Sequence, residues 1–163
     1  MLDARMVAGL NRQFQLELFS SHLYLAMSAW SEAQNLPGFA RWLRIQADEE
    51  RAHAMKIYDY LLDQGVQPVV PAVEAPPASY PSIQDVFRGV VEHEKKITAA
   101  LHELQGLAFE LKDYATQALL SWFIQEQVEE EKNAGLMAAH LEMIGDRSAA
   151  ILNLDHRAGK RGS

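Results

Sequence analysis

The chain contains no cysteine among its 163 residues. It therefore cannot form disulfides, iron–sulfur clusters or thiolate zinc sites, and any metal ion must be held by oxygen and imidazole ligands. Such ligands favour hard cations and iron. The sequence also lacks an apolar run of membrane-spanning length, and its first residues lack the apolar core of a signal peptide. These absences predict a soluble, cytoplasmic protein with no membrane partner.

Negatively charged residues are in modest excess over positively charged ones. Aspartate and glutamate number 22 against 15 lysines and arginines, which gives a formal net charge of −7. This balance argues against a nucleic-acid partner and for the attraction of cations. The length is that of one domain, able to bury roughly two-thirds of its unfolded surface, so we treat residues 1–163 as a single unit.

Helical spacing of apolar residues predicts a first pair of long helices. One runs from about residue 3 to 34 and the other from Pro37 to near Gly65, with a short turn between them. Helices joined by so short a turn are antiparallel neighbours. The apolar positions that define the first helix are Leu10, Phe14, Leu18, Leu25 and Ala29.

A second pair of helices is predicted in the other half of the chain. One runs from about residue 82 to 109, and the next from Asp113, its N-cap, to Ile144. A short fifth helix is expected at about 146–155. The last residues, 157–163, form a basic tail that we expect to be frayed.

The segment between the two pairs, residues 65–81, holds five prolines and cannot be helical. Extended, these residues reach up to about 56 Å, whereas a helix of about 28 residues is roughly 42 Å long. The segment can therefore cross the whole length of a bundle. The predicted fold class is all-α: a four-helix bundle with one long crossover loop and a short C-terminal fifth helix.

Three polar positions of the first half recur 77 residues later in the second half. All six lie on the apolar stripes of their predicted helices, and two similar helix pairs facing each other can build a two-metal site. Burying even one unpaired carboxylate costs several kcal/mol, so an inward-facing set implies bound metal, trapped protons or water. The pairs are Glu17 and Glu94, Glu50 and Gln127, and His53 and Glu130.

Each motif taken alone has a plainer interpretation. A single Glu-x-x-His, such as Glu50 with His53, arises by chance in about half of chains like this one and would be a surface pair. Glu17 or Glu94 alone could be a boundary residue hydrogen-bonded to a tyrosine. The acidic run at 126–131 resembles a solvated helix face. Only the joint pattern favours a metal centre.

Four stretches of sequence carry a likeness to a known family. They are residues 16–21 (LELFSS) with Tyr24, residues 27–30 (MSAW), residues 46–53 (QADEERAH) and residues 122–132 (WFIQEQVEEEK). With them the chain resembles bacterial non-haem ferritins over essentially its whole length. The resemblance implies a ferritin-like bundle and an iron-storage function, in which Fe(II) is oxidised by dioxygen or hydrogen peroxide and stored as a ferric oxide mineral.

The same resemblance implies roles for individual residues. Glu17, Glu50 and His53 would bind the first iron of a ferroxidase centre. Glu50 would bridge to a second iron held by Glu94 and Glu130, with Gln127 beside it. Tyr24 corresponds to a tyrosine next to the diiron centre that can donate an electron and orient a ligand. A third iron site would be built from Glu49, Glu126, Glu129 and Glu130.

The resemblance also implies a hollow homo-oligomeric shell of twenty-four chains. Bacterioferritins have Glu-x-x-His in both halves and a haem methionine after the bridging glutamate. Here Gln127-x-x-Glu130 and Arg51 stand at those places, so haem is not expected. Three alternatives stay open: a diiron peroxidase or oxygen-activating bundle protein, a DNA-protecting miniferritin, and a metal-free helical scaffold that binds partner helices through an acidic face.

Overall fold

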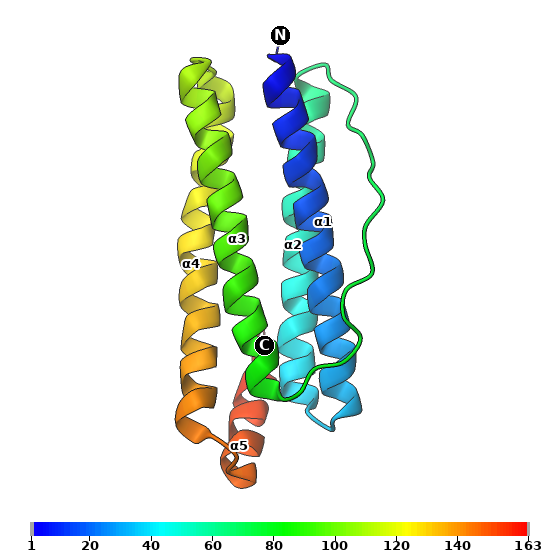
Figure 1. Ribbon diagram of the computed structural model, residues 1–163, viewed down its shortest axis with the longest axis vertical. Helices are drawn as coiled ribbons and strands as arrows, with labels where there is room; N and C mark the ends of the chain where they lie inside the picture. Colours follow the sequence, from blue (N-terminus) through cyan, green and yellow to red (C-terminus); the bar gives the residue numbers. More distant parts are fainter. Residues whose placement is uncertain (1, 163) are drawn as a thin grey trace.

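The computed structural model describes residues 2–162, and within them all regular secondary structure is helical. Two antiparallel helix pairs, α1 with α2 and α3 with α4, lie side by side, and α5 packs at one end of the bundle (Figure 1). The predicted fold class is therefore confirmed. The helices are α1 (Ala4–Ala33), α2 (Pro37–Asp63), α3 (Ile83–Glu110), α4 (Tyr114–Ile144) and α5 (Ser148–Ala158).

The crossover between α2 and α3 runs along the outside of the first helix pair, from one end of the bundle to the other (Figure 1). Two hydrogen bonds hold it against α1. The Val69 N–H donates to Asn11 Oδ1 at 2.7 Å, and Gln15 Nε2 donates to the Ala72 carbonyl at 3.1 Å. Because the connection spans the bundle, α2 and α3 run parallel and bring their midpoints to the same level.

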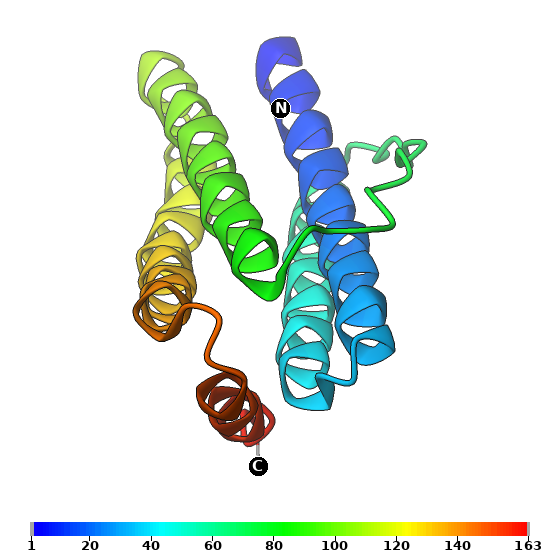
Figure 2. The same cartoon turned by 60° about the horizontal axis from the view of Figure 1, so that its bottom comes forward.

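The start of α2 is capped by a residue far away in the sequence. Asp3, Ser82 and Asp113 cap α1, α3 and α4 with their own side chains, as expected for these residue types. The first turn of α2 has no such cap. Instead, the Phe39 N–H donates to Asp155 Oδ1 of α5 at 2.8 Å, so α5 lies across the start of α2 (Figure 2).

The C-terminal segment differs from the sequence-based expectation. Helix α5 begins two residues later and ends three residues further on than the predicted 146–155. The tail was predicted to be frayed, and this is wrong for its described part. Arg157 lies within α5, and the Arg161 guanidinium contacts side chains of α2. Ser163 lies outside the described residues.

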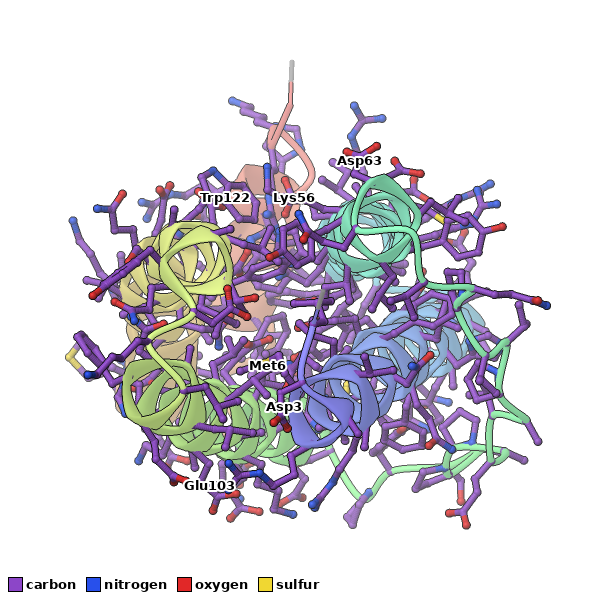
Figure 3. The ribbon with its side chains drawn as sticks, turned by 90° about the horizontal axis from the view of Figure 1, so that it is seen from above. Asp3, Met6, Lys56, Asp63, Glu103 and Trp122 are labelled. Atoms are coloured by element: carbon purple, nitrogen blue, oxygen red, sulfur yellow. The ribbon has the colours of Figure 1, made fainter. Side chains whose placement is uncertain are left out.

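The interior consists of two apolar clusters separated by a polar layer. One cluster packs around Phe39 and Phe87, and the other around Leu10 and Phe123. Figure 3 looks down the bundle and shows Met6 directed into the second cluster. No helix within residues 2–162 has both the length and the apolar character needed to cross a membrane.

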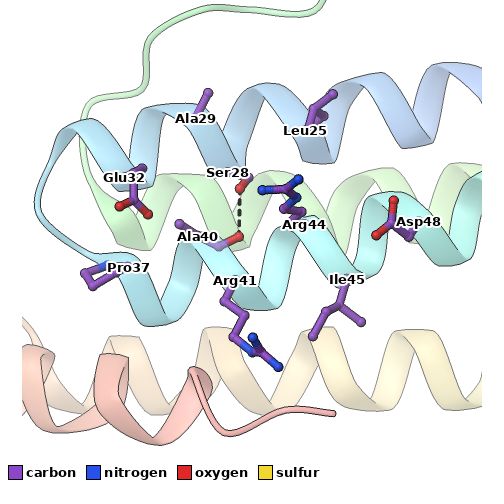
Figure 4. Close-up of a pocket in the computed structure, with 10 residues that line it drawn as sticks. All are labelled: Leu25, Ser28, Ala29, Glu32, Pro37, Ala40, Arg41, Arg44, Ile45 and Asp48. Atoms are coloured by element: carbon purple, nitrogen blue, oxygen red, sulfur yellow. Dashed lines mark hydrogen bonds between the residues drawn. The ribbon is translucent and has the colours of Figure 1, made fainter. Parts of the chain in front are cut away.

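The apolar stripe predicted for α1 is only partly right. Leu10 and Phe14 are buried, whereas Leu25 is 53% exposed and Ala29 is also exposed. Both face outward into a groove between α1 and α2 (Figure 4). The buried face in that stretch is instead formed by Leu23, Tyr24, Met27, Ser28 and Ser31.

Candidate metal centre

All four long helices contribute polar side chains to the layer between the two apolar clusters. Each of these side chains is 7% exposed or less, although an isolated glutamate in such a place would be costly. They come from the middle of each helix, where the crossover has aligned the two pairs. The residues are Glu17 of α1, Gln46, Glu50 and His53 of α2, Glu94 of α3, and Gln127 and Glu130 of α4.

Glu17, Glu50 and His53 form the first group that could hold a metal ion. Each offers one ligand atom, and these atoms lie within 4.8 Å of one another. His53 Nδ1 is 3.2 Å from Glu50 Oε2, and Gln13 Nε2 donates to Glu17 Oε1 at 2.7 Å. The other carboxylate oxygen of Glu17, Oε2, is buried with no hydrogen-bond partner. A buried carboxylate oxygen without a partner is what a cation at this position would satisfy.

Glu50, Glu94 and Glu130 form a second group, also with ligand atoms within 4.8 Å of one another. Glu50 belongs to both groups, so its carboxylate can bridge two cations. The Tyr24 hydroxyl donates to Glu94, and Gln127 Nε2 donates to Glu94 Oε2 at 3.0 Å. In this orientation Gln127 acts as a hydrogen-bond donor beside the second group.

The residues expected at a third iron site are only partly brought together. Glu126 and Glu130 form a group with His53, whose ligand atoms again lie within 4.8 Å of one another. Glu129 is exposed, and the Glu49 carboxylate instead accepts from Arg161 Nη2 at 2.6 Å. Neither belongs to a metal-sized group within the described part of the chain. A third site at these four residues stays a prediction.

Sequence reasoning missed the amides that hold the carboxylates in place. Gln13 donates to Glu17, and Gln46 Nε2 donates to Glu130 Oε2 at 2.6 Å and to Glu50 Oε1 at 3.4 Å. Both glutamines stand four residues before a predicted ligand, on the same helix face. That spacing was the available signal. Such contacts fix carboxylate orientation and commonly matter to metal affinity by about 10–100-fold.

Aromatic rings close the centre on the side of α4. Trp122 and Phe123 meet the His53 ring edge to face, with centroids 5.5 and 5.9 Å away. Lys56 Nζ lies 4.0 Å from the centre of the Trp122 ring, and this contact links α2 to α4 (Figure 3). These rings exclude water from one side and lower the local dielectric constant, which strengthens interactions between a bound cation and the carboxylates.

Burial shifts the titration of the whole polar layer. It raises the pKa of the Glu17 carboxyl well above its ordinary value, with a further contribution from Glu50. Burial and then Glu94 raise the pKa of Glu50, and burial raises that of Glu94. Burial and then Glu94 raise the pKa of Glu130 to about 7. Without metal the layer therefore retains protons, which a bound cation would displace.

We expect the metal-free protein to lose stability as the pH rises. Because the pKa of Glu130 is about 7 against an ordinary 4.5, the folded chain binds more protons than the unfolded chain between these values. This contribution to stability is complete below about pH 4.5 and is lost as the pH rises through about 7. The contribution of Glu130 can be measured from the melting temperatures of chelator-treated wild type and Glu130→Gln at about pH 5 and about pH 8.

The melting temperature of wild type minus that of Glu130→Gln should be higher at the lower pH. Saturating Zn(II) should remove the loss of wild-type stability at the higher pH, because metal binds the deprotonated carboxylates. A difference between the two proteins that does not change with pH would contradict the assignment of a raised pKa to Glu130.

The outer face of the first helix pair carries a groove of about 700 Å³. Its lining includes Leu25, Arg44 and Asp48, and at its floor Ser28 Oγ donates to the Ala40 carbonyl at 2.7 Å (Figure 4). None of the buried carboxylates opens into it. The groove therefore lies apart from the buried carboxylates.

The arrangement of helices and buried ligands agrees with the comparisons to known proteins. The Ferritin-like domain family matches residues 7–144. The chain belongs to the ferritin family. It is 40% identical to a probable bacterial non-heme ferritin-like protein of Haemophilus influenzae, over 98% of this chain and 96% of that one. It is 39% identical to a bacterial non-heme ferritin of Staphylococcus epidermidis, over 90% and 88%.

Solved ferritin structures have the same fold. An open pore ferritin from the archaeon Archaeoglobus fulgidus superposes with a TM-score of 0.97, is 39% identical, and covers 99% of both chains. The all-α bundle with its crossover and short fifth helix is thus the ferritin fold. In this ferritin, the donor set of carboxylates and one imidazole suits iron. One buried carboxylate oxygen of that set, Glu17 Oε2, has no hydrogen-bond partner.

Proposed function

We propose that this ferritin stores iron by oxidising Fe(II) at a ferroxidase centre inside each chain. The observation that carries the proposal is the Glu50 carboxylate, which belongs to two metal-sized groups at once while Glu17 Oε2 in the first group has no partner. A bridged pair of cations satisfies both features. Iron is here the substrate and cargo of the protein.

The reaction follows from the ligand set. Two Fe(II) ions bridged by Glu50, about 3.5–4 Å apart, together supply two electrons. Dioxygen takes up these electrons with two protons to give hydrogen peroxide, and both irons become Fe(III). Glu17 and His53 hold one iron, and Glu94 and Glu130 hold the other. Anionic oxygens stabilise the higher charge of Fe(III), which favours the oxidised state.

The two sites are unequal, and this inequality supports release of the product. The second half of the chain has Gln127 where the first half has Glu50, so the second iron has no matching anion from α4 at that position. Gln127 supplies a neutral amide that donates to Glu94, so the second group has one anion fewer with which to attract a cation. Iron held more loosely can pass inward to a ferric mineral.

The storage function requires a cavity shared by several chains. We propose a homo-oligomeric shell of twenty-four chains that encloses a hydrated ferric oxide mineral, as the family resemblance implies. The support is the match to the Archaeoglobus fulgidus ferritin along nearly the full length of both chains, including α5. Haem is not part of the proposal.

Aerobic titration with Fe(II) tests the storage function. We expect fast oxidation of about two irons per chain, followed by continued uptake well beyond that number, and iron-cored spheres by electron microscopy. Saturation at the site count would indicate an oxygen-activating enzyme instead. Absence of binding would indicate a metal-free scaffold. Prior saturation with Zn(II), which does not change its oxidation state, should block the fast phase.

A further inference from the structure

Four polar side chains of α3 and α4 form a hydrogen-bonded box beside the metal centre. Glu94 and Thr98 stand one turn apart on α3, and Gln127 and Glu131 stand one turn apart on α4. Thr98 Oγ1 donates to Glu131 Oε1 at 2.6 Å. Gln127 Nε2 donates to Thr98 Oγ1 at 3.2 Å and to Glu94 Oε2 at 3.0 Å. The box therefore links the buried Glu94 to Glu131, which is only partly buried.

The protons of this box decide which way the Gln127 amide faces. An ionised carboxylate only accepts hydrogen bonds, so the single hydroxyl proton of Thr98 is used on Glu131. Toward Gln127 the hydroxyl oxygen can then only accept, which requires the amide nitrogen and excludes the amide oxygen. Glu131 belongs to none of the metal-sized groups within the described residues. It nevertheless holds Gln127 in the donor orientation through Thr98.

In this orientation Gln127 is one of two donors that hold Glu94. The Tyr24 hydroxyl donates to one oxygen of the Glu94 carboxylate, and Gln127 Nε2 donates to the other. Glu94 alone does not fix the amide, because a carboxyl group accepts when ionised and donates when protonated. If Gln127 turned over, its oxygen would face the ionised carboxylate and repel it. The Thr98 hydroxyl is therefore the contact that keeps Gln127 holding Glu94.

We propose that Thr98 and Glu131 are positioning residues for the second metal group, acting through Gln127. They keep the Gln127 amide as a donor, and the amide keeps the Glu94 carboxylate in place within that group. The first group does not contain Glu94 and is outside their reach. The inference rests on the proposed diiron centre. The affinity of its looser second site is then set in part by two residues that do not contact the metal.

Binding isotherms of Zn(II), which is redox-inert, on the intact metal-free protein test the positioning role. Thr98→Val keeps the branched shape of the side chain and removes the hydroxyl, so the Gln127 amide is free to turn over. We expect the affinity of the second group for Zn(II) to fall by about tenfold, the lower end of the effect of losing a contact that orients a ligand. The first group should keep its affinity. Glu94→Gln identifies the equivalent of Zn(II) that occupies the second group.

Two further variants separate positioning from general support of the fold. Thr98→Ser keeps the hydroxyl and should restore the affinity of the second group. In a double-mutant cycle with Gln127→Ala, Thr98→Val should cost no further affinity once the Gln127 amide is gone. General support of the fold predicts instead that the two losses add and that both groups weaken together.

Thr116→Val is the matched control, because Thr116 makes contacts of the same kind away from the metal centre. Its hydroxyl donates to the Asp113 carboxylate and is hydrogen-bonded to Tyr60 in the first turn of α4. Loss of these buried contacts should lower the melting temperature of the metal-free protein. The ratio of the two Zn(II) affinities should stay as in wild type.

The outcomes separate the positioning role from the proposed function. If Thr98→Val binds Zn(II) at the second group as tightly as wild type, or weakens both groups equally, the positioning role is wrong and the diiron centre stands. If wild type itself binds no pair of tight Zn(II) ions, the diiron centre is wrong and the positioning role falls with it.

Discussion

Replacing Glu50 with glutamine is expected to abolish the fast phase of Fe(II) oxidation. Glu50 is the residue shared by both metal-sized groups, and the change removes its charge while keeping its shape. Because loss of a supporting contact alone typically costs 10–100-fold in affinity or activity, loss of the bridge should lower the initial rate by at least about 100-fold. Stopped-flow measurement of Fe(III) formation at two Fe(II) per chain gives the rate.

The same substitution should stabilise the metal-free protein. Glu50 is 1% exposed, and both its burial and the neighbouring Glu94 disfavour its charge. Glutamine removes that repulsion and can still accept the Gln46 amide. Each kcal/mol added to the free energy of unfolding would raise the melting temperature by about 2–4 °C for a chain of this size. Lower activity together with higher metal-free stability is the pattern of a binding site and not of a damaged fold.

Glu103→Gln serves as the control for Glu50→Gln. Glu103 lies exposed on α3, outside the polar layer, so its replacement changes the net charge equally without touching the centre (Figure 3). Its rate and melting temperature should stay near wild type. An undiminished initial rate in Glu50→Gln would contradict the bridging role.

Replacing Gly38 with alanine is expected to detach α5 from the bundle. A Cβ at this position would lie 1.7 Å from the Asp155 carbonyl oxygen and 2.5 Å from its carbon. Both are backbone atoms, so a side chain cannot rotate to make room. Helix α5 would have to move away, which breaks the hydrogen bond from Phe39 to Asp155 and exposes Leu154.

The loss can be estimated from these contacts. Uncovering a leucine costs about 1.5–3 kcal/mol, and loss of a helix cap costs about 1 kcal/mol. We therefore expect the free energy of unfolding to fall by roughly 2.5–4 kcal/mol. Chemical denaturation followed by circular dichroism measures the change. Because Arg161 follows α5, detachment should also free Glu49.

Gly106→Ala is the matched control for Gly38→Ala. Gly106 lies within α3, and a Cβ there meets nothing within 4 Å. Alanine in a helix interior should therefore stabilise the chain by about 0.5–1 kcal/mol. If Gly38→Ala unfolded at the same denaturant concentration as wild type, the close approach of α5 to α2 would be wrong.

The local part of this structure could be predicted from the sequence. The apolar period of 3.6 residues located the four long helices, and the five prolines located the crossover, because periodicity and proline each constrain residues that are close in sequence. The sequence was a poorer guide to which face of a helix is buried where apolar residues lie on both faces. Leu25 fits the apolar spacing of α1, yet it faces outward beside α2.

The carboxylate layer was also predictable, because its members keep fixed spacings along two similar helix pairs. Glu17, Glu50 and His53, and their counterparts 77 residues later, are all buried as that pattern indicated. The pattern did not identify Gln46, whose role depends on Glu130, 84 residues away. The 77-residue repeat can identify only polar positions that are present in both halves, and Gln46 has no polar counterpart in the second half.

By itself the sequence determined the helices, the crossover that makes α2 and α3 parallel, and the set of carboxylates and one imidazole that the four helices bury together. Helical geometry turns these short-range spacings directly into shared faces. Only the tertiary structure decided that α5 caps α2 and that Arg161 reaches Glu49 and Gln46. These contacts join residues more than a hundred positions apart, and they depend on how closely two backbones approach at Gly38, which no local pattern records.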